Sequence, residues 1–333
     1  MSPQKRSRKQ TKKRGAIALT GVAGFPGAKL LEALLERNDF DHIVSLDLKR
    51  PPIPVTKGKF YKIDLTDPVA DAILADILRK EGCECVVHCA FLSKPIHSSS
   101  YAHELEEIGT MHLLNACAQS GVRKIVVRST TMVYGAHPDN PAYLTESHPL
   151  RGDLAYPFIR DKVNVERLIE RFRRRNPDIS VTVLRPCTTL GPTVQNLATL
   201  YLDHRVSLTI LGHDPLIQLV HEVDVIDAFL RAIETDVEGV FNIAGKGVLP
   251  LSAILRVAGN LRVPLRYRSA VRFTDLLWLA QLSPAPSPHL DYLRYPWVAD
   301  VTAAEEKLGF SPHHTTAETI EHYARGLRLK RAL

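Results

Sequence analysis

Gly21, Gly24 and Gly27 have the residue type and the spacing that let a backbone turn approach a phosphate group closely. They follow an apolar run at 16–19 and precede helical periodicity at 30–35. A strand, a glycine turn and a helix in this order bring backbone N–H groups and the positive end of a helix dipole to one place, which favours an anion. The spacing is GxxGxxG, a weak pattern alone, so neighbouring residues must support this interpretation.

An acid stands 20 residues after the last of these glycines. Asp47 ends a second apolar strand at 44–47, where a carboxylate can hold the hydroxyls of an adenosine ribose. Lys49 and Arg50 follow and could meet a 2′-phosphate, but the acid favours NAD over NADP. The pattern therefore predicts a dinucleotide site, and a purely structural glycine turn is the alternative.

Two more strand ends supply candidate residues for the same site. Asp64 and Leu65 follow a short strand at 60–63, and Ala90 ends the apolar strand at 85–90. Ligands bind at the carboxyl ends of strands in parallel sheets, and a small residue there leaves room for a flat ring. Asp64 could instead start the next helix.

The elements that must position these residues alternate along the chain. Strands at 124–127 and 180–184 enclose a long helix at 156–175, and this alternation predicts an α/β fold, a doubly wound parallel Rossmann sheet. The chain is expected to return to the sheet at 218–221 and 239–243. The predicted division is a basic disordered arm at 1–14, an NAD(P)-binding Rossmann domain at 15–190 with 216–244 returning to it, and a smaller C-terminal substrate lobe at 191–215 and 245–333.

The net charge of +7 comes from the arm. Residues 1–14 hold seven of the 43 basic residues and no acid, so the other 36 match the 36 acids in number. A neutral body gives no electrostatic footprint for nucleic acid. Nucleic acid is therefore an unlikely partner, and only the arm could touch an anionic surface or polymer.

No run of 18 apolar residues exists, so we expect no membrane span. The five cysteines are odd in number and lie mostly in predicted strands and helices, which is typical of reduced side chains in a cytoplasmic protein. No metal site is expected, because Cys83 and Cys85 have the wrong spacing for a zinc pair. His313 and His314 fall in a probable loop and are interpreted as solvated.

The chain resembles the extended short-chain dehydrogenases/reductases, specifically the NAD-dependent epimerase/dehydratase group of the UDP-glucose 4-epimerase type. The resemblance covers roughly 15–330 and rests on motifs in the expected order: GVAGFPG, DLTDP, CVVHCAF, STTMVYG, a lysine helix, LRPCTTLGP and QLVHEVDV. It implies bound NAD and a nucleotide sugar or similar hydroxyl-bearing substrate. It also implies a homodimer built from helices at 104–120 and 156–175. The implied cofactor residues are Gly21, Gly24, Phe25, Gly27, Asp47, Asp64, Leu65, Ala90 and Lys162.

The resemblance also implies a Ser/Thr, Tyr, Lys catalytic set. Thr130 matches the family hydroxyl and would bond the substrate oxygen, although it could simply cap the end of its strand. Lys162 matches the family lysine, with Glu166 marking the register, and would hold the nicotinamide ribose. Arg185 and Gln218 fall near substrate-lobe motifs, and a structural ion pair is the alternative for Arg185.

The family motif YxxxK is broken, because Phe158 stands where the tyrosine belongs. Phe158 and Lys162 share one helix face, but a phenyl ring has no proton to transfer. Tyr156 is the candidate substitute, either by reaching in from the helix start or through a slipped register that pairs it with Arg160. A second departure is Pro26, which lacks the N–H that would face the pyrophosphate.

The leading hypothesis is an NAD-dependent epimerase/dehydratase-type oxidoreductase that uses Thr130, Lys162 and either Tyr156 or a water. The alternative is a catalytically impaired NAD(P)-binding sensor or scaffold of the same fold. A third class, a nucleic-acid partner of the arm, would bind in a salt-sensitive way. The apolar segment 273–282 could line a pocket for a greasier molecule than a sugar, or form a core helix.

Overall fold

A computed structural model describes residues 15–37 and 39–332. The predicted basic arm at 1–14 lies outside these residues. Seven parallel strands form the central sheet in the order β11-β6-β5-β4-β1-β2-β3. Their bounds are β1 Ala16–Thr20, β2 Ile43–Asp47, β3 Gly58–Lys62, β4 Cys83–His88, β5 Lys124–Arg128, β6 Ser180–Pro186 and β11 Gly239–Ile243.

Side chains along β1 alternate between the two faces of this sheet, as a strand's period of two requires. Ile17 and Leu19 pack in one hydrophobic cluster, whereas Ala16 and Ala18 pack in another. All four are buried, which explains why the strand is a continuous apolar run rather than an alternating one. Both faces of the sheet must therefore be covered by helices.

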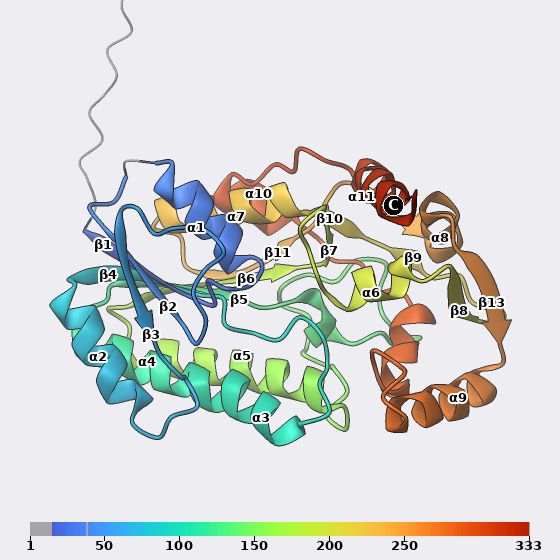
Figure 1. Ribbon diagram of the computed structural model, residues 1–333, viewed down its shortest axis with the longest axis horizontal. Helices are drawn as coiled ribbons and strands as arrows, with labels where there is room; N and C mark the ends of the chain where they lie inside the picture. The colour runs from blue at the N-terminus through green and yellow to red at the C-terminus, as the bar shows by residue number, and fades with distance from the viewer. Residues whose placement is uncertain (1–14, 38, 333) are drawn as a thin grey trace, which may run out of the picture.

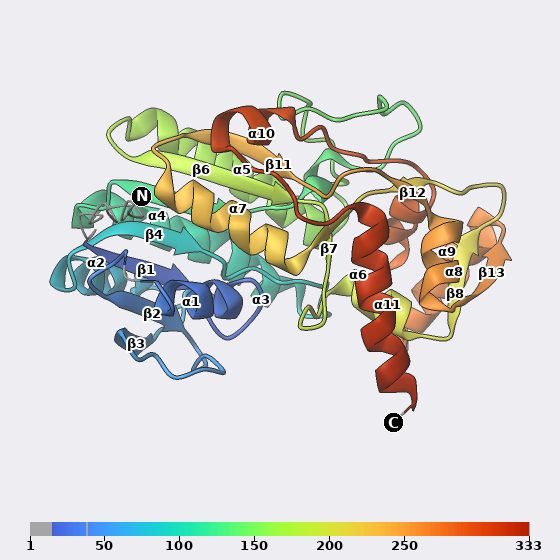
Figure 2. The same ribbon diagram turned by 90° about the horizontal axis from the view of Figure 1, so that it is seen from above.

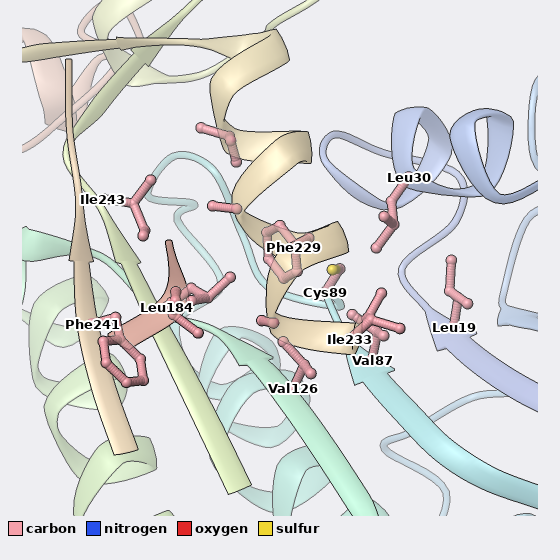
Figure 3. Close-up of a cluster of buried hydrophobic side chains, with 14 of the residues drawn as sticks. Leu19, Leu30, Val87, Cys89, Val126, Leu184, Phe229, Ile233, Phe241 and Ile243 are labelled. Carbon is pink, nitrogen blue, oxygen red and sulfur yellow. The ribbon is translucent and has the colours of Figure 1, made fainter. Parts of the chain in front are cut away.

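Helices cover the two faces in separate layers, as Figure 1 and Figure 2 show. On one face Leu30 of α1 and Phe229 of α7 pack over Leu19 and Val126, and Figure 3 shows Phe229 pointing toward the strands. On the other face lie α2, α4 and α5. The bounds are α1 Gly27–Leu35, α2 Ala70–Lys80, α3 Ser99–His103, a π-helical turn Glu104–Ile108, α4 Gly109–Ser120, a 3-10 turn Thr131–Tyr134, α5 Pro157–Arg175, α7 Glu222–Glu234 and α10 Thr302–Leu308.

A smaller lobe lies beyond the carboxyl ends of the strands (Figure 1). Its short strands pair two by two, β7 with β10, β8 with β13 and β9 with β12, and its helices enclose a separate apolar cluster. The bounds are β7 Thr188–Leu190, α6 Leu197–Asp203, β8 Val206–Ile210, β9 Leu216–Ile217, β10 Leu219–His221, β12 Leu249–Pro250, α8 Leu251–Ala258, β13 Leu261–Leu265, α9 Tyr267–Leu279, a 3-10 turn Ser287–Leu293 and α11 Thr316–Ala332.

The expected Rossmann sheet is confirmed, with one difference in pairing. The strand expected at 239–243 joins the sheet beside β6, but the one expected at 218–221 pairs with β7 in a separate two-stranded sheet. Three residues flanked by other strands carry no signal of which partner they meet. Within 15–37 and 39–332, none of the helices is both long enough and apolar enough to cross a bilayer.

Candidate active site

The glycine turn lies where β1 leads into α1, and each glycine has its own reason to lack a side chain. A Cβ on Gly21, whose φ is +72°, would lie 2.6 Å from the Cys89 carbonyl carbon, and one on Gly27 would lie 2.2 Å from the Gly21 oxygen. A Cβ on Gly24 would meet nothing within 4 Å. Gly21 and Gly27 are therefore needed for packing, whereas Gly24 leaves open space at the surface of the turn. Open space beside a helix N-terminus suits a phosphate.

The open space belongs to a cavity of about 660 Å³, here called the glycine-turn cavity. It lies at the carboxyl ends of β1 and β4, where the strand order reverses and dinucleotides bind in such sheets. Its lining residues include Gly21, Ala23, Gly24, Phe25, Asp47, Leu65, Ala90, Phe91, Ser93 and Tyr101.

Asp47 stands at the rim of this cavity with its carboxylate fixed. One oxygen accepts the Ala23 N–H and the other accepts the Lys49 N–H, each at 3.0 Å. Each oxygen keeps lone pairs for further donors, so two ribose hydroxyls can bind there. Arg50, which could meet a 2′-phosphate, has its guanidinium 5.3 Å from the centre of the Phe60 ring.

A second cavity of about 590 Å³, here called the lobe cavity, adjoins the first, because Ser93 lines both. Thr130 lines it from the end of β5. The Thr130 hydroxyl oxygen accepts the Met132 N–H at 3.3 Å and so caps the 3-10 turn, while its own proton has no partner among the described residues. The hydroxyl can therefore cap the turn and donate to a ligand at once.

Lys162 also lines the lobe cavity, but its ammonium is bound within the protein. Its Nζ donates to the two carboxylate oxygens of Glu106 at 2.8 and 3.0 Å and to the Leu92 carbonyl at 3.1 Å. The same Nζ lies 4.3 Å from the centre of the Phe158 ring. Burial lowers the pKa of Lys162 and raises the pKa of Glu106. The two residues form a buried charge pair at the place where a phenol is missing.

Comparison with known proteins identifies the family of this chain. The model of the NAD dependent epimerase/dehydratase family matches residues 17–244. The chain belongs to this family. An uncharacterised protein of Mycobacterium tuberculosis is 31% identical over 93% of this chain and 83% of its own length. The UDP-glucose 4-epimerase of Schizosaccharomyces pombe is 26% identical over 66% of this chain and 71% of its own.

Solved structures of the epimerase/dehydratase family share the fold. The UDP-glucose 4-epimerase of Thermotoga maritima, solved with UDP-glucose, superposes with a TM-score of 0.75 at 20% identity, over 95% of this chain and 99% of that one. A dTDP-glucose 4,6-dehydratase of Streptomyces venezuelae with bound NAD gives 0.73 at 21% identity, over 95% and 98%. The parallel sheet and the smaller lobe are thus those of this family.

Six of the nine expected cofactor residues line the glycine-turn cavity, whereas Gly27, Asp64 and Lys162 do not; Lys162 lines the lobe cavity instead. Gly27 lies behind the turn, where it packs against Gly21. The Asp64 carboxylate accepts the Thr66 N–H at 2.9 Å and the Thr66 hydroxyl at 2.7 Å, and Asp64 does not line the cavity. Asp64 therefore shapes the turn after β3, and it does not start the next helix, because α2 begins at Ala70.

Tyr156 lines neither cavity, which differs from its expected role as a substitute phenol. It is 1% exposed, its hydroxyl has no partner among the described residues, and its ring centre lies 5.9 Å from that of Phe158. Burial raises its pKa. The slipped register does not occur either, because Phe158 and Lys162 line the lobe cavity, whereas Tyr156 and Arg160 do not. The Tyr156 ring packs in a hydrophobic cluster at the start of α5, so its hydroxyl is not available to a ligand.

Arg185 and Gln218 are structural as well, so neither reaches the lobe cavity. The buried Arg185 guanidinium donates to Glu166 at 2.8 Å and to the Tyr134 hydroxyl at 2.6 Å. The Gln218 amide makes two hydrogen bonds to the backbone of Ala299, at 3.2 and 3.0 Å. The ion pair, weighed above as the alternative for Arg185, is the arrangement that forms.

Two residues at the site were missed. Glu106 lies in the π-helical turn, a feature often found at functional sites, but the ELEE run that contains it resembles a solvated helix face. Arg128 lines the lobe cavity and its Nη1 donates to the Phe25 carbonyl at 3.5 Å, so it lies beside the glycine turn. Burial lowers its pKa. Its place at the end of β5 was the available signal.

His313 and His314 are bonded rather than simply solvated. Both ring Nδ1 atoms lie near the buried Asp224 carboxylate, at 2.9 and 3.1 Å. His314, His221 and His322 each bring a ring nitrogen within 4.8 Å of the others, away from both cavities. The His221 and His314 rings are stacked with centres 4.1 Å apart. A single ion would have to lie in the plane of both rings, which this stacking opposes.

Proposed function

We propose that this chain is an NAD-dependent oxidoreductase that oxidises a hydroxyl of a substrate held in the lobe cavity, or reduces the corresponding carbonyl. The observation that carries the proposal is the adjacency of the two cavities. Ser93 lines both, the glycine-turn cavity has Asp47 at its rim, and the lobe cavity carries Thr130 and Lys162. A ligand in one cavity therefore borders a ligand in the other.

The residues of the glycine-turn cavity fit the cofactor. The open face of Gly24 accommodates a diphosphate, and the free lone pairs of Asp47 accept two ribose hydroxyls. Pro26 supplies no N–H, so backbone donors from the rest of the turn must hold the phosphates. When bound, NAD supplies the acceptor or donor of a hydride.

The chain's own residues orient the substrate and leave the proton transfer to water. Thr130 donates its free proton to the substrate oxygen. Lys162 and Glu106 form an ion pair beside the lobe cavity. Because Phe158 cannot accept or release a proton, water in the cavity takes up or supplies the proton of the reacting hydroxyl. General acid–base assistance contributes about a hundred- to ten-thousand-fold in rate, so we expect slow turnover.

A non-catalytic NAD(P)-binding sensor of the same fold is the second candidate. Phe158 in place of a phenol and the internal pairing of Lys162 favour it. The full chain should be assayed for bound NAD and for the dissociation constant of NAD by calorimetry. Turnover should then be followed by the absorbance of the reduced cofactor, first with UDP-glucose and dTDP-glucose and then with apolar alcohols.

Phe158→Tyr is the decisive variant. It returns a phenol next to Lys162, so turnover should rise by about a hundredfold or more, whereas the control Phe158→Leu should not increase turnover. NAD binding with no turnover in either parent or Phe158→Tyr would favour the sensor. A chain that binds no nicotinamide cofactor would contradict both candidates.

A further inference from the structure

The wall of the lobe cavity is apolar along most of its length. Leucine, isoleucine and aromatic side chains from the small lobe form it. They come from α6, α8, α9, the 3-10 turn Ser287–Leu293 and the segment after that turn, and include Leu197, Tyr201, Ile254, Leu277, Leu290 and Trp297. Contact with such a wall favours a ligand that is itself apolar.

Three of the polar side chains in this wall are bonded inside the protein, whereas the ring nitrogens His289 Nδ1 and Trp297 Nε1 have no partner among the described residues. The Tyr201 hydroxyl donates to the Leu208 carbonyl at 2.7 Å, and the Tyr292 hydroxyl donates to the Met132 carbonyl at 2.7 Å. The Asn196 side chain binds the backbone of Thr189 and Thr199. A ligand in the lobe half of the cavity therefore meets few unsatisfied donors or acceptors.

Charge is also missing where a nucleotide sugar would need it. With its sugar beside Thr130, the diphosphate and nucleoside of such a substrate would extend into the lobe. Among the described residues that line the lobe cavity no acid occurs, and the lysines and arginines are only Lys162 and Arg128. Lys162 is paired with Glu106, and Arg128 lies beside Phe25 on the cofactor side. A buried diphosphate without cations is strongly unfavourable.

The apolar wall continues to the outer surface along α9. Phe273 and Leu282 line the cavity and are yet 50% and 73% exposed. Leu276, on the same helix, is 65% exposed. Figure 1 shows α9 at the end of the molecule opposite β3. Contiguous exposed apolar residues at a cavity mouth are typical of a binding entrance.

We propose that the lobe cavity binds an apolar alcohol or ketone, a hydrocarbon chain or fused-ring skeleton with one polar end, which enters past α9. Its oxygen lies at Thr130 and its hydrocarbon body lies along the lobe wall. The proposal rests on the proposed function only for the reacting group, because the binding itself requires no turnover. The same molecule could arrive from free solution or from a bilayer.

The test is binding without cofactor. Dodecanol and cholesterol carrying a nitrobenzoxadiazole fluorophore are titrated against the full chain, delivered either from cyclodextrin or from phosphatidylcholine vesicles, and UDP-glucose is titrated by calorimetry. We expect saturable one-to-one binding of a labelled alcohol and none of UDP-glucose. Uptake from both carriers indicates a soluble source, and uptake from vesicles alone indicates a bilayer.

Leu277 of α9 and Leu329 of α11 give a matched pair of variants. Leu277→Arg puts a charge into the cavity wall and should weaken alcohol binding at least tenfold, whereas Leu329→Arg adds the same charge at an exposed leucine that does not line the cavity and should leave binding unchanged. Equal binding by both variants would mean adsorption to the surface and would overturn the proposal. Binding of UDP-glucose instead of the alcohols by the unmodified chain would also overturn the proposal, as would binding of neither ligand. These two results do not depend on whether Leu277→Arg folds. The NAD affinity, measured separately, tests the proposed function.

Discussion

Replacing Asp47 with alanine should weaken NAD binding about a hundredfold or more. The Asp47 carboxylate already accepts two backbone N–H groups, from Ala23 and Lys49. A carboxylate has about four lone-pair sites, so about two remain for the ribose hydroxyls. A hydrogen bond to a charged group contributes about 1.5–3 kcal/mol. Two such bonds contribute about 3 kcal/mol at the least, and each 1.4 kcal/mol is about tenfold in the dissociation constant.

Calorimetry of the nucleotide-free chain measures this change directly and needs no substrate. Asp64→Ala is the matched control, because the Asp64 carboxylate binds Thr66 and lies outside the cavity lining, so its NAD affinity should equal that of the parent. Asp47→Asn keeps one acceptor oxygen and should lose less than Asp47→Ala. Parental affinity in Asp47→Ala, or an equal loss in Asp64→Ala, would refute the assignment of the ribose site.

Other positions separate folding from binding. Gly24→Ala should keep the parental free energy of unfolding but bind NAD more weakly in calorimetry. Gly27→Ala should be destabilised, because its Cβ would lie 2.2 Å from a carbonyl oxygen. Equal losses of stability in the two variants would contradict this. Glu106→Gln strands a buried ammonium and should cost about 3–5 kcal/mol in urea unfolding, and adding Lys162→Met should recover part of that loss; no recovery would argue against the pair. Burial lowers the pKa of His88 to about 3, from 6.5 in the unfolded chain. Between these two pH values the unfolded chain binds one more proton than the folded chain, so the free energy of unfolding falls as the pH drops from 6.5 toward 3, by about 1.4 kcal/mol per pH unit. His88→Asn should remove that slope from urea midpoints, and an unchanged slope would refute it.

The features that could be predicted from the sequence are those that depend on residues close together in the chain. The glycine turn and Asp47 lie within one strand–helix–strand unit, so apolar runs and turn residues fix them. Phe158 and Lys162 share a face because a helix repeats every 3.6 residues. The parallel, doubly wound sheet follows from the alternation of strands and helices along the chain.

The features that escaped prediction depend on contacts between distant segments. Glu106 meets Lys162 across 56 residues, and Gln218 meets Ala299 across 81. Arg185 could equally have bound a ligand, and only the nearby Glu166 settles its role. Tyr156 shows the same limit, since the side on which its ring packs is decided by the Tyr292 and Trp297 cluster more than a hundred residues later. Sequence pattern gives a residue's face, whereas tertiary packing gives its partner.

The sparse packing of α9 has a consequence for how the protein can change over evolutionary time. Only Ala270 and Thr274 of this helix are buried, so displacing it forfeits little of the free energy that keeps the sheet folded. Amide hydrogens of α9 should accordingly exchange with solvent well before those of β1 or β4. Mutations in α9 that reshape the entrance of the lobe cavity can then accumulate without lowering the stability of the central sheet.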